Sequence, residues 1–165
     1  DWVELYNPTN ESIAIGWWEF KDGNDTHVFI IPENQVLESG AYLVLCKDSL
    51  AFNDNFPNVS NFIGEFDFGL NGGGELVRLF DAEELLVDEV NYDDSSPWPL
   101  EPDGNGPTLE LIHPSLDNDL GVNWAASDNN GGTPGMVNSV YTADSSKSLV
   151  SRIVINEINY NSADE

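Results

Sequence analysis

Basic residues are scarce in this sequence. Five lysines and arginines stand against 30 aspartates and glutamates among 165 residues, which gives a formal net charge of −25 at pH 7. Proteins that bind nucleic acid or anionic lipid draw most of their affinity from Lys and Arg. The composition therefore argues against nucleic acid and anionic membranes as partners.

Long apolar runs and cysteine pairs are also missing. No window approaches the roughly 18 consecutive apolar residues that a membrane span needs, so we expect no membrane insertion. The single cysteine, Cys46, allows no internal disulfide and is expected to be a small buried hydrophobe in its apolar run. One Cys and two histidines on separate expected strands, His27 and His113, exclude a zinc site with the usual three or four nitrogen and sulfur ligands.

Apolar residues are still abundant enough for a folded core. They make up 40% of the chain, whereas disordered chains combine high net charge with few apolar residues. Short segments rich in β-branched and aromatic residues recur between turn residues, which predicts an all-β chain folded as an antiparallel β-sandwich. The expected strands are 2–6, 13–20, 27–31, 41–47, 75–80, 85–92, 108–113 and 153–160. A short helix is expected at 49–56, capped by Ser49 and stopped by Pro57.

The end of the chain differs from the rest. We expect a sandwich over residues 1–138, a Ser-rich linker at 139–152, and a strand in 153–165 that completes this sandwich or a neighbouring one. Such a strand must pair, because unpaired backbone groups beside apolar side chains are costly and sticky. The residues of this assembly strand are Ile153, Val154, Ile155, Asn156, Glu157, Ile158 and Tyr160.

Several segments, taken in order, resemble one known family. They are Asp1-Trp2-Val3-Glu4-Leu5-Tyr6-Asn7-Pro8, Trp17-Trp18-Glu19-Phe20, Ile31-Pro32, Gly40-Ala41-Tyr42-Leu43-Val44-Leu45, Phe68-Gly69-Leu70, Gly73-Gly74-Glu75-Leu76-Val77-Arg78-Leu79-Phe80-Asp81, Val87-Asp88-Glu89-Val90-Asn91-Tyr92, Leu109-Glu110-Leu111, Asn123-Trp124 and Gly132-Thr133-Pro134-Gly135. Their order and spacing over most of residues 1–138 resemble the lamin tail domain, an immunoglobulin-like β-sandwich of nuclear lamins and many secreted bacterial proteins. The resemblance is to the bacterial extracellular type, and it implies a non-catalytic module outside the cell or on its surface.

One departure from the family concerns strand order. The Ile-Asn-Glu-Ile-x-Tyr-Asn strand ordinarily comes first in this family, whereas here it lies at 155–161. A tandem array cut within a repeat, a circular permutation, or a subunit that donates its last strand would each give this order. The 139–152 segment can stretch up to roughly 50 Å, against a radius of gyration of about 15 Å, so the strand can return or reach outward.

A strand that reaches outward would fill the open sheet edge of another copy or of an adjacent repeat. Such a head-to-tail contact builds a filament unless it closes into a ring. We therefore expect a building block of a surface fibre or repeat array. The alternative is an accessory domain that attaches a secreted enzyme to glycan, a surface or a calcium-rich matrix.

No pattern in the sequence indicates an enzyme. A Gly-x-Ser-x-Gly nucleophile elbow is absent, and the glycine run at 72–74 lacks the Lys-Ser/Thr of a phosphate loop.

Two kinds of binding residue remain candidates. Loops rich in oxygen ligands could hold calcium, although turns capped by Asp and Asn side chains explain the same composition. The candidate calcium ligands are Asp22, Asn24, Asp25, Asp103, Asn105, Asp117 and Asp119. For glycan contact the candidates are Trp98, which lies between two prolines, and Trp18, which neighbours Trp17 on an expected strand.

Overall fold

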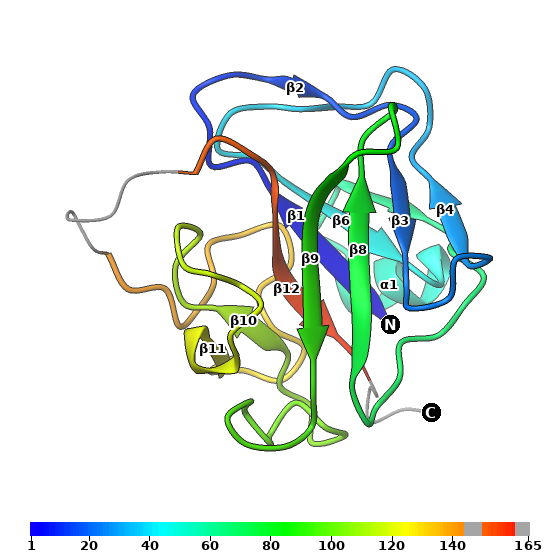
Figure 1. Cartoon of the computed structure of the whole chain (residues 1–165). Coiled ribbons are helices and arrows are strands. Elements are labelled where there is room, and N and C mark those ends of the chain that lie inside the picture. The colour runs from blue at the N-terminus through cyan, green and yellow to red at the C-terminus, as the bar shows by residue number, and fades with distance from the viewer. Residues whose placement is uncertain (144–149, 161–165) are drawn as a thin grey trace.

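The fold is described from a computed structural model, which covers residues 1–143 and 150–160. The chain forms two packed sheets with strand orders β11-β10-β12-β1-β6-β7 and β4-β3-β8-β9, and a two-stranded ribbon, β2-β5 (Figure 1). The large sheet comprises β1 (Trp2–Tyr6), β6 (Tyr42–Cys46), β7 (Phe62–Gly64), β10 (Leu109–Leu111), β11 (Trp124–Ala126) and β12 (Val154–Asn159). The others are β2 (Ile13–Ala14), β3 (Glu19–Lys21), β4 (Val28–Ile30), β5 (Val36–Leu37), β8 (Glu75–Phe80) and β9 (Leu86–Tyr92).

The main core lies between the two sheets. Because side chains alternate along a strand, Val3 and Leu5 of β1 face inward and meet residues such as Phe20 and Leu79 of the small sheet, all with no exposed surface. This arrangement confirms the predicted all-β, immunoglobulin-like sandwich.

A second apolar cluster lies on the other face of the large sheet. Helix α1 (Ser49–Asn55) places Phe52 against Trp2, Val44 and Cys46 there. Cys46 is 1% exposed, as the sequence predicts, and burial raises the pKa of its thiol to about 11.

Local features depart from the predicted elements in three ways. The expected strand 13–20 is divided into β2 and β3, because Trp17 between them has a φ of 69°, which no strand residue adopts. Asp48, not Ser49, caps α1: its carboxylate accepts a hydrogen bond from Ala51 N at 2.8 Å. Strands β5, β7 and β11 were not predicted.

No helix within the described ranges is long and apolar enough to cross a bilayer.

Candidate functional site: the slot of the last strand

The last strand lies inside the large sheet of its own chain. Strand β12 runs antiparallel to both β1 and β10, with Trp2 opposite Asn159 and Leu109 opposite Ile158. In Figure 1, β12 in red crosses the molecule beside β1 in blue. We call the gap between β1 and β10 the slot. In this structure β12 therefore fills the slot of its own chain.

The apolar side chains of β12 supply part of the main core. Ile155 and Ile158 have no exposed surface, and Tyr160 packs on Tyr92 with ring centroids 4.5 Å apart. The two isoleucines are three residues apart, so in a regular strand they would face opposite sides. A register shift opposite Glu4 and Leu5 leaves Asn156 as an extra residue in β12, and this bulge turns both isoleucines inward.

The opposite sheet holds the start of β12 through Asp88. This β9 residue is 4% exposed, and its Oδ2 accepts hydrogen bonds from Ile155 N and Asn118 Nδ2, both at 2.7 Å. Its Oδ1 lies 3.1 Å from Arg152 Nη2. Burial raises the pKa of Asp88, while the hydrogen bonds and Arg152 act against that rise. Asp88 thus binds a backbone group of β12 and the side chain of Arg152, which lies just before this strand.

Replacing Asp88 with asparagine should weaken this inter-sheet contact. Asparagine keeps the shape but has one acceptor oxygen, so a buried donor of β12 loses its partner. We expect the free energy of unfolding to fall by about 1–3 kcal/mol, measured by urea denaturation. The matched control is Glu89→Gln at the exposed neighbouring position of β9, which should stay within about 0.5 kcal/mol of the unaltered protein. Equal losses in the two variants would contradict the assigned role.

Three glutamates form a row across the strands that border the slot. Glu4 of β1 lies opposite Glu157 of β12, which in turn lies opposite Glu110 of β10. All three have no exposed surface. We call them the glutamate row. Burial is costly for carboxylates that lack a cationic partner. Hydrogen-bond donors in the segment that covers this row must therefore offset part of that cost.

The segment from Thr133 to Val140 covers the row with hydrogen-bond donors. Glu4 accepts from Gly135 N at 2.5 Å and Glu157 accepts from Thr133 N at 3.0 Å. Glu110 accepts from Val140 N at 3.1 Å. Each carboxyl group therefore ties a backbone amide of one loop to a different strand.

Further donors come from the strands and from loop side chains. Thr108 Oγ1 donates to Glu157 at 2.5 Å, and Asn156 Nδ2, in the bulge, donates to Glu4 at 3.0 Å. Ser139 Oγ donates to Glu110 at 2.7 Å. The slot is thus lined by a continuous polar network on the face opposite the core.

Burial also changes the acidity of the row. It raises the pKa of Glu4 to about 8, and the negative charge of Glu110 adds to that effect. It raises the pKa of Glu157 strongly as well, with further contributions from the charges of Glu4 and Glu110. The hydrogen bonds described above partly offset both shifts. Glu4 and Glu157 therefore keep bound protons at pH values where exposed glutamates have lost theirs.

Sequence reasoning missed the glutamate row. Glu4 and Glu110 alternate with apolar residues, in Val3-Glu4-Leu5 and Leu109-Glu110-Leu111, which is the pattern of a strand with one solvated face. Glu157 lies between Asn156 and Ile158. The loop that buries the row is rich in Gly, Thr, Pro and Ser and resembles an ordinary turn. No local signal in the sequence shows that this turn folds back over the sheet.

The two tryptophans predicted to contact a glycan lie in the core. Trp18 and Trp98 are 9% and 8% exposed. Trp98 packs near Trp124, with ring centroids 6.1 Å apart, and closely against Gly121. The prediction for both residues is corrected, because neither offers a free ring face. The left-handed backbone at Trp17 instead turns that side chain outward, where it is 56% exposed.

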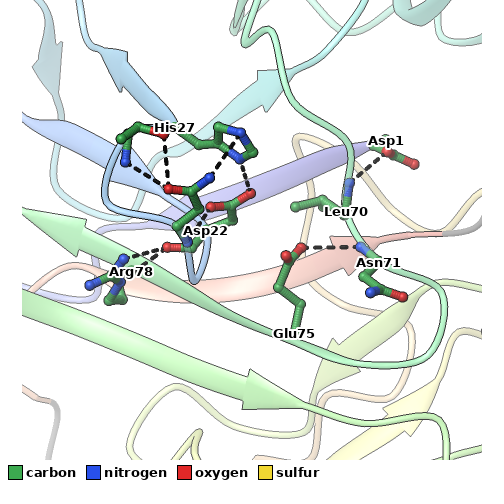
Figure 2. A network of polar contacts seen from close by, with 9 residues as sticks. Asp1, Asp22, His27, Leu70, Asn71, Glu75 and Arg78 are labelled. Carbon is green, nitrogen blue, oxygen red and sulfur yellow. Dashed lines mark hydrogen bonds and ion pairs between the residues drawn. The ribbon is translucent and has the colours of Figure 1, made fainter.

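The first group of candidate calcium ligands is engaged within the protein, and Figure 2 shows the contacts of Asp22. Asp22 is 3% exposed, and its carboxylate accepts from Asn24 N at 2.7 Å and contacts His27 Nδ1 at 2.6 Å. Asp25 forms an ion pair with Arg78 at 3.0 Å. These contacts cap a turn and fix it to β8.

The other candidate calcium ligands lie in two separate loops. Asp103 accepts a hydrogen bond at its carbonyl from the Asn105 side chain at 2.7 Å. Asp117 accepts from Asp119 N at 3.2 Å, and the Asp119 carboxylate accepts from Asn91 N at 3.0 Å. Within the described part of the chain, no group of three or more His, Cys, Asp or Glu residues could hold a metal ion. Calcium binding stays a prediction, and the structure does not bring its candidate ligands together.

Comparison with known families gives a match over the first part of the chain. The model described as Lamin Tail Domain matches residues 1–94, which is more than half of the chain and extends from β1 through β9. Strands β10 to β12, including the strand in the slot, lie beyond the matched residues. No curated protein matches the chain.

Proposed function

Because this chain belongs to the lamin tail domain family, whose fold is a non-catalytic immunoglobulin-like sandwich, we propose that it is an extracellular structural module, a building block of a surface fibre or tandem array. In this proposal copies are joined head to tail through the C-terminal strand, by exchange between chains or by continuation into the next repeat. The observation that carries the proposal is the position of β12, which arrives last along the chain yet lies at the centre of the large sheet.

The packing of β12 supports a joining role. Its buried isoleucines and its pairing with two strands mean that a sandwich without it exposes core and two rows of unpaired backbone groups. An identical strand from another copy would satisfy the same slot. Exchange of an identical element costs little, because every contact of the closed form is kept.

The register supports the continuation mode. Asn159 lies opposite Trp2, and Ile158 lies opposite Val3, so the end of β12 is beside the start of β1. This is the register of a hairpin that runs from β12 into β1, which is the usual strand order of the family. In a tandem array, β12 of one repeat would then pair with β1 of the next, and 139–152 would link the two sandwiches.

A cross-strand disulfide tests the exchange mode. Tyr6 and Val154 lie directly opposite each other, a position whose Cα separation of about 4.5–5.5 Å suits a disulfide. We expect the full chain with Tyr6→Cys, Val154→Cys and Cys46→Ala, refolded at high protein concentration and oxidised, to give a ladder of linked chains on a non-reducing gel. The matched control places cysteines at Glu19 and Phe80, which are paired within the small sheet, and should give monomers only.

The same positions test the continuation mode. In a two-copy chain, Val154→Cys is placed only in the first copy and Tyr6→Cys only in the second, again with Cys46→Ala in both. An intrachain disulfide then forms only if β12 of the first copy pairs with β1 of the second. If this disulfide does not form and the single chain gives no ladder at any concentration, the proposal is overturned.

A further inference from the structure

We infer that the glutamate row, Glu4, Glu157 and Glu110, is a proton-dependent latch on β12, which holds the strand in the slot while the row carries a proton and loosens it when the row ionises. The link to assembly rests on the proposed function, because β12 must leave its own slot before it can enter another. The latch itself is a property of a single chain.

The geometry places three acidic groups side by side without a cation. Adjacent strands carry them in direct register, and each is fully buried. Over residues 1–143 and 150–160, no Lys, Arg or His forms an ion pair with any of them. Three neighbouring negative charges of this kind repel each other strongly, because burial removes the screening that water provides. The row is therefore most stable when it is partly protonated.

The Thr133 hydroxyl shows where a proton fits. It lies 2.8 Å from Glu110 Oε1 and 3.5 Å from Glu157 Oε2. A hydroxyl has one proton and can donate to only one of these oxygens. When the Thr133 hydroxyl donates its hydrogen bond to Glu110, a lone pair of the hydroxyl oxygen faces Glu157. A protonated Glu157 can then donate a hydrogen bond to that oxygen. Loss of that proton leaves two oxygens facing each other without a hydrogen between them.

The other titratable groups near the row do not compensate its charge. Tyr6 on β1 stacks on Tyr42 of β6 with ring centroids 4.5 Å apart, and both interact with Tyr141, which follows the covering segment. Tyr141 in turn stacks on His113 with ring centroids 5.4 Å apart. Burial raises the pKa of both Tyr6 and Tyr42, so these two stay neutral while the glutamates titrate. The row and its covering loop thus respond to pH mainly through the carboxyl groups.

The direction of the pH effect follows from the raised pKa values of Glu4 and Glu157. In the folded chain burial raises the pKa of Glu4 to about 8, so this group keeps its proton up to that pH, whereas the pKa of an exposed glutamate is about 4.5. Stability from the latch is therefore fully present below about pH 4.5 and is lost as the pH rises towards 8. For each proton that the folded row retains, the opening equilibrium constant rises up to about tenfold per pH unit in this window.

The experiment compares the pH dependence of unfolding in the full, dilute chain and in Glu157→Gln. The unaltered protein should lose stability steadily from pH 5 to pH 8, and its β12 amides should lose protection from hydrogen exchange after correction for intrinsic rates. Glu157→Gln removes one ionisable group but keeps a hydrogen-bonding side chain of similar shape. Its opening constant should change about tenfold less per pH unit wherever Glu157 titrates.

Two controls separate the latch from general charge repulsion. Exposed carboxylates finish titrating by about pH 6, and 0.5 M salt screens their repulsion. At pH 6–8 in salt, the difference between the unaltered protein and Glu157→Gln therefore reports the row, because all other titratable groups are common to both proteins. Glu89→Gln, at an exposed position, should keep the pH profile of the unaltered protein. If Glu157→Gln does not fold, Glu4→Gln provides the same comparison.

Each outcome bears on one hypothesis alone. A profile for Glu157→Gln or Glu4→Gln that parallels the unaltered protein, or stability that rises from pH 5 to pH 8, overturns the latch. A flattened profile supports it whether or not the cysteine ladder forms. The yield of the cysteine ladder bears on the fibre proposal alone, and the latch is decided by the unfolding profile of the single chain.

Discussion

Ile155→Ala is expected to lower the free energy of unfolding by about 2–5 kcal/mol. Ile155 has no exposed surface and lies in the main core, so truncation removes buried apolar area and leaves a cavity between two sheets that cannot easily close. The side chain comes from the last strand, which makes this loss a measure of how firmly β12 belongs to the sandwich. Urea denaturation that follows the midpoint and the m-value gives the change.

Ile30→Ala is the matched control for that substitution. Ile30 lies on the edge strand β4 and is 50% exposed, so the same chemical change should cost less than about 1 kcal/mol. If both variants lose the same stability, or if Ile155→Ala is nearly neutral, β12 is not part of the core in solution. That result would remove the basis of the strand-joining proposal.

Gly132→Ala should be more damaging than its size suggests. Gly132 has a φ of +70°, and a Cβ there would overlap the Glu157 carboxylate and the Thr108 hydroxyl. Both of these side chains are fully buried and hydrogen-bonded to each other, so they have little room to move. We expect a loss of about 3 kcal/mol or more, from overlap and from the left-handed backbone together, measured by urea denaturation at pH 5.

Gly40→Ala separates the cost of the left-handed backbone from the cost of the atomic overlap. Gly40 has the same φ of +70° but no atom within 4 Å of its ideal Cβ, so it reports the backbone cost alone, about 1–2 kcal/mol. The excess loss in Gly132→Ala then measures the close contact between the loop and the glutamate row. Equal losses at the two glycines would contradict the packing of this loop against Glu157 and Thr108.

The sequence was a good guide where side-chain periodicity decides the structure. Strands β1, β6, β8, β9 and β12 are long enough for alternating or apolar residues to show, and they were predicted. Strand β5 has two residues, and β7 pairs parallel to its neighbour β6, so neither carries a local pattern of its own. The left-handed backbone at Trp17 has no marker in the sequence, because non-glycine residues seldom adopt it.

The site was predictable only on its apolar side. The isoleucines of β12 required a core, and the sequence shows this directly. The sequence did not show whether this core belongs to the same sandwich or to a neighbouring one, because the 139–152 segment is long enough for either. The polar side depends on Thr133 to Val140 folding over three strands that are distant in the sequence, and only tertiary structure reveals such a contact. The buried Trp18 and Trp98 differ from expectation for the same reason.

The pairing of Trp2 with Asn159 has a mechanical consequence. A pull applied at these two neighbouring residues acts at one end of the β1–β12 ladder, so hydrogen bonds would break one pair after another and the strands would peel apart under low force. In an exchanged assembly, tension would instead enter β12 at Val154 and load the whole ladder along its length. Its first resistance would come from Asp88, which anchors Arg152 and Ile155. The β1–β12 pairing would therefore resist a pulling force weakly within one chain and strongly between two chains.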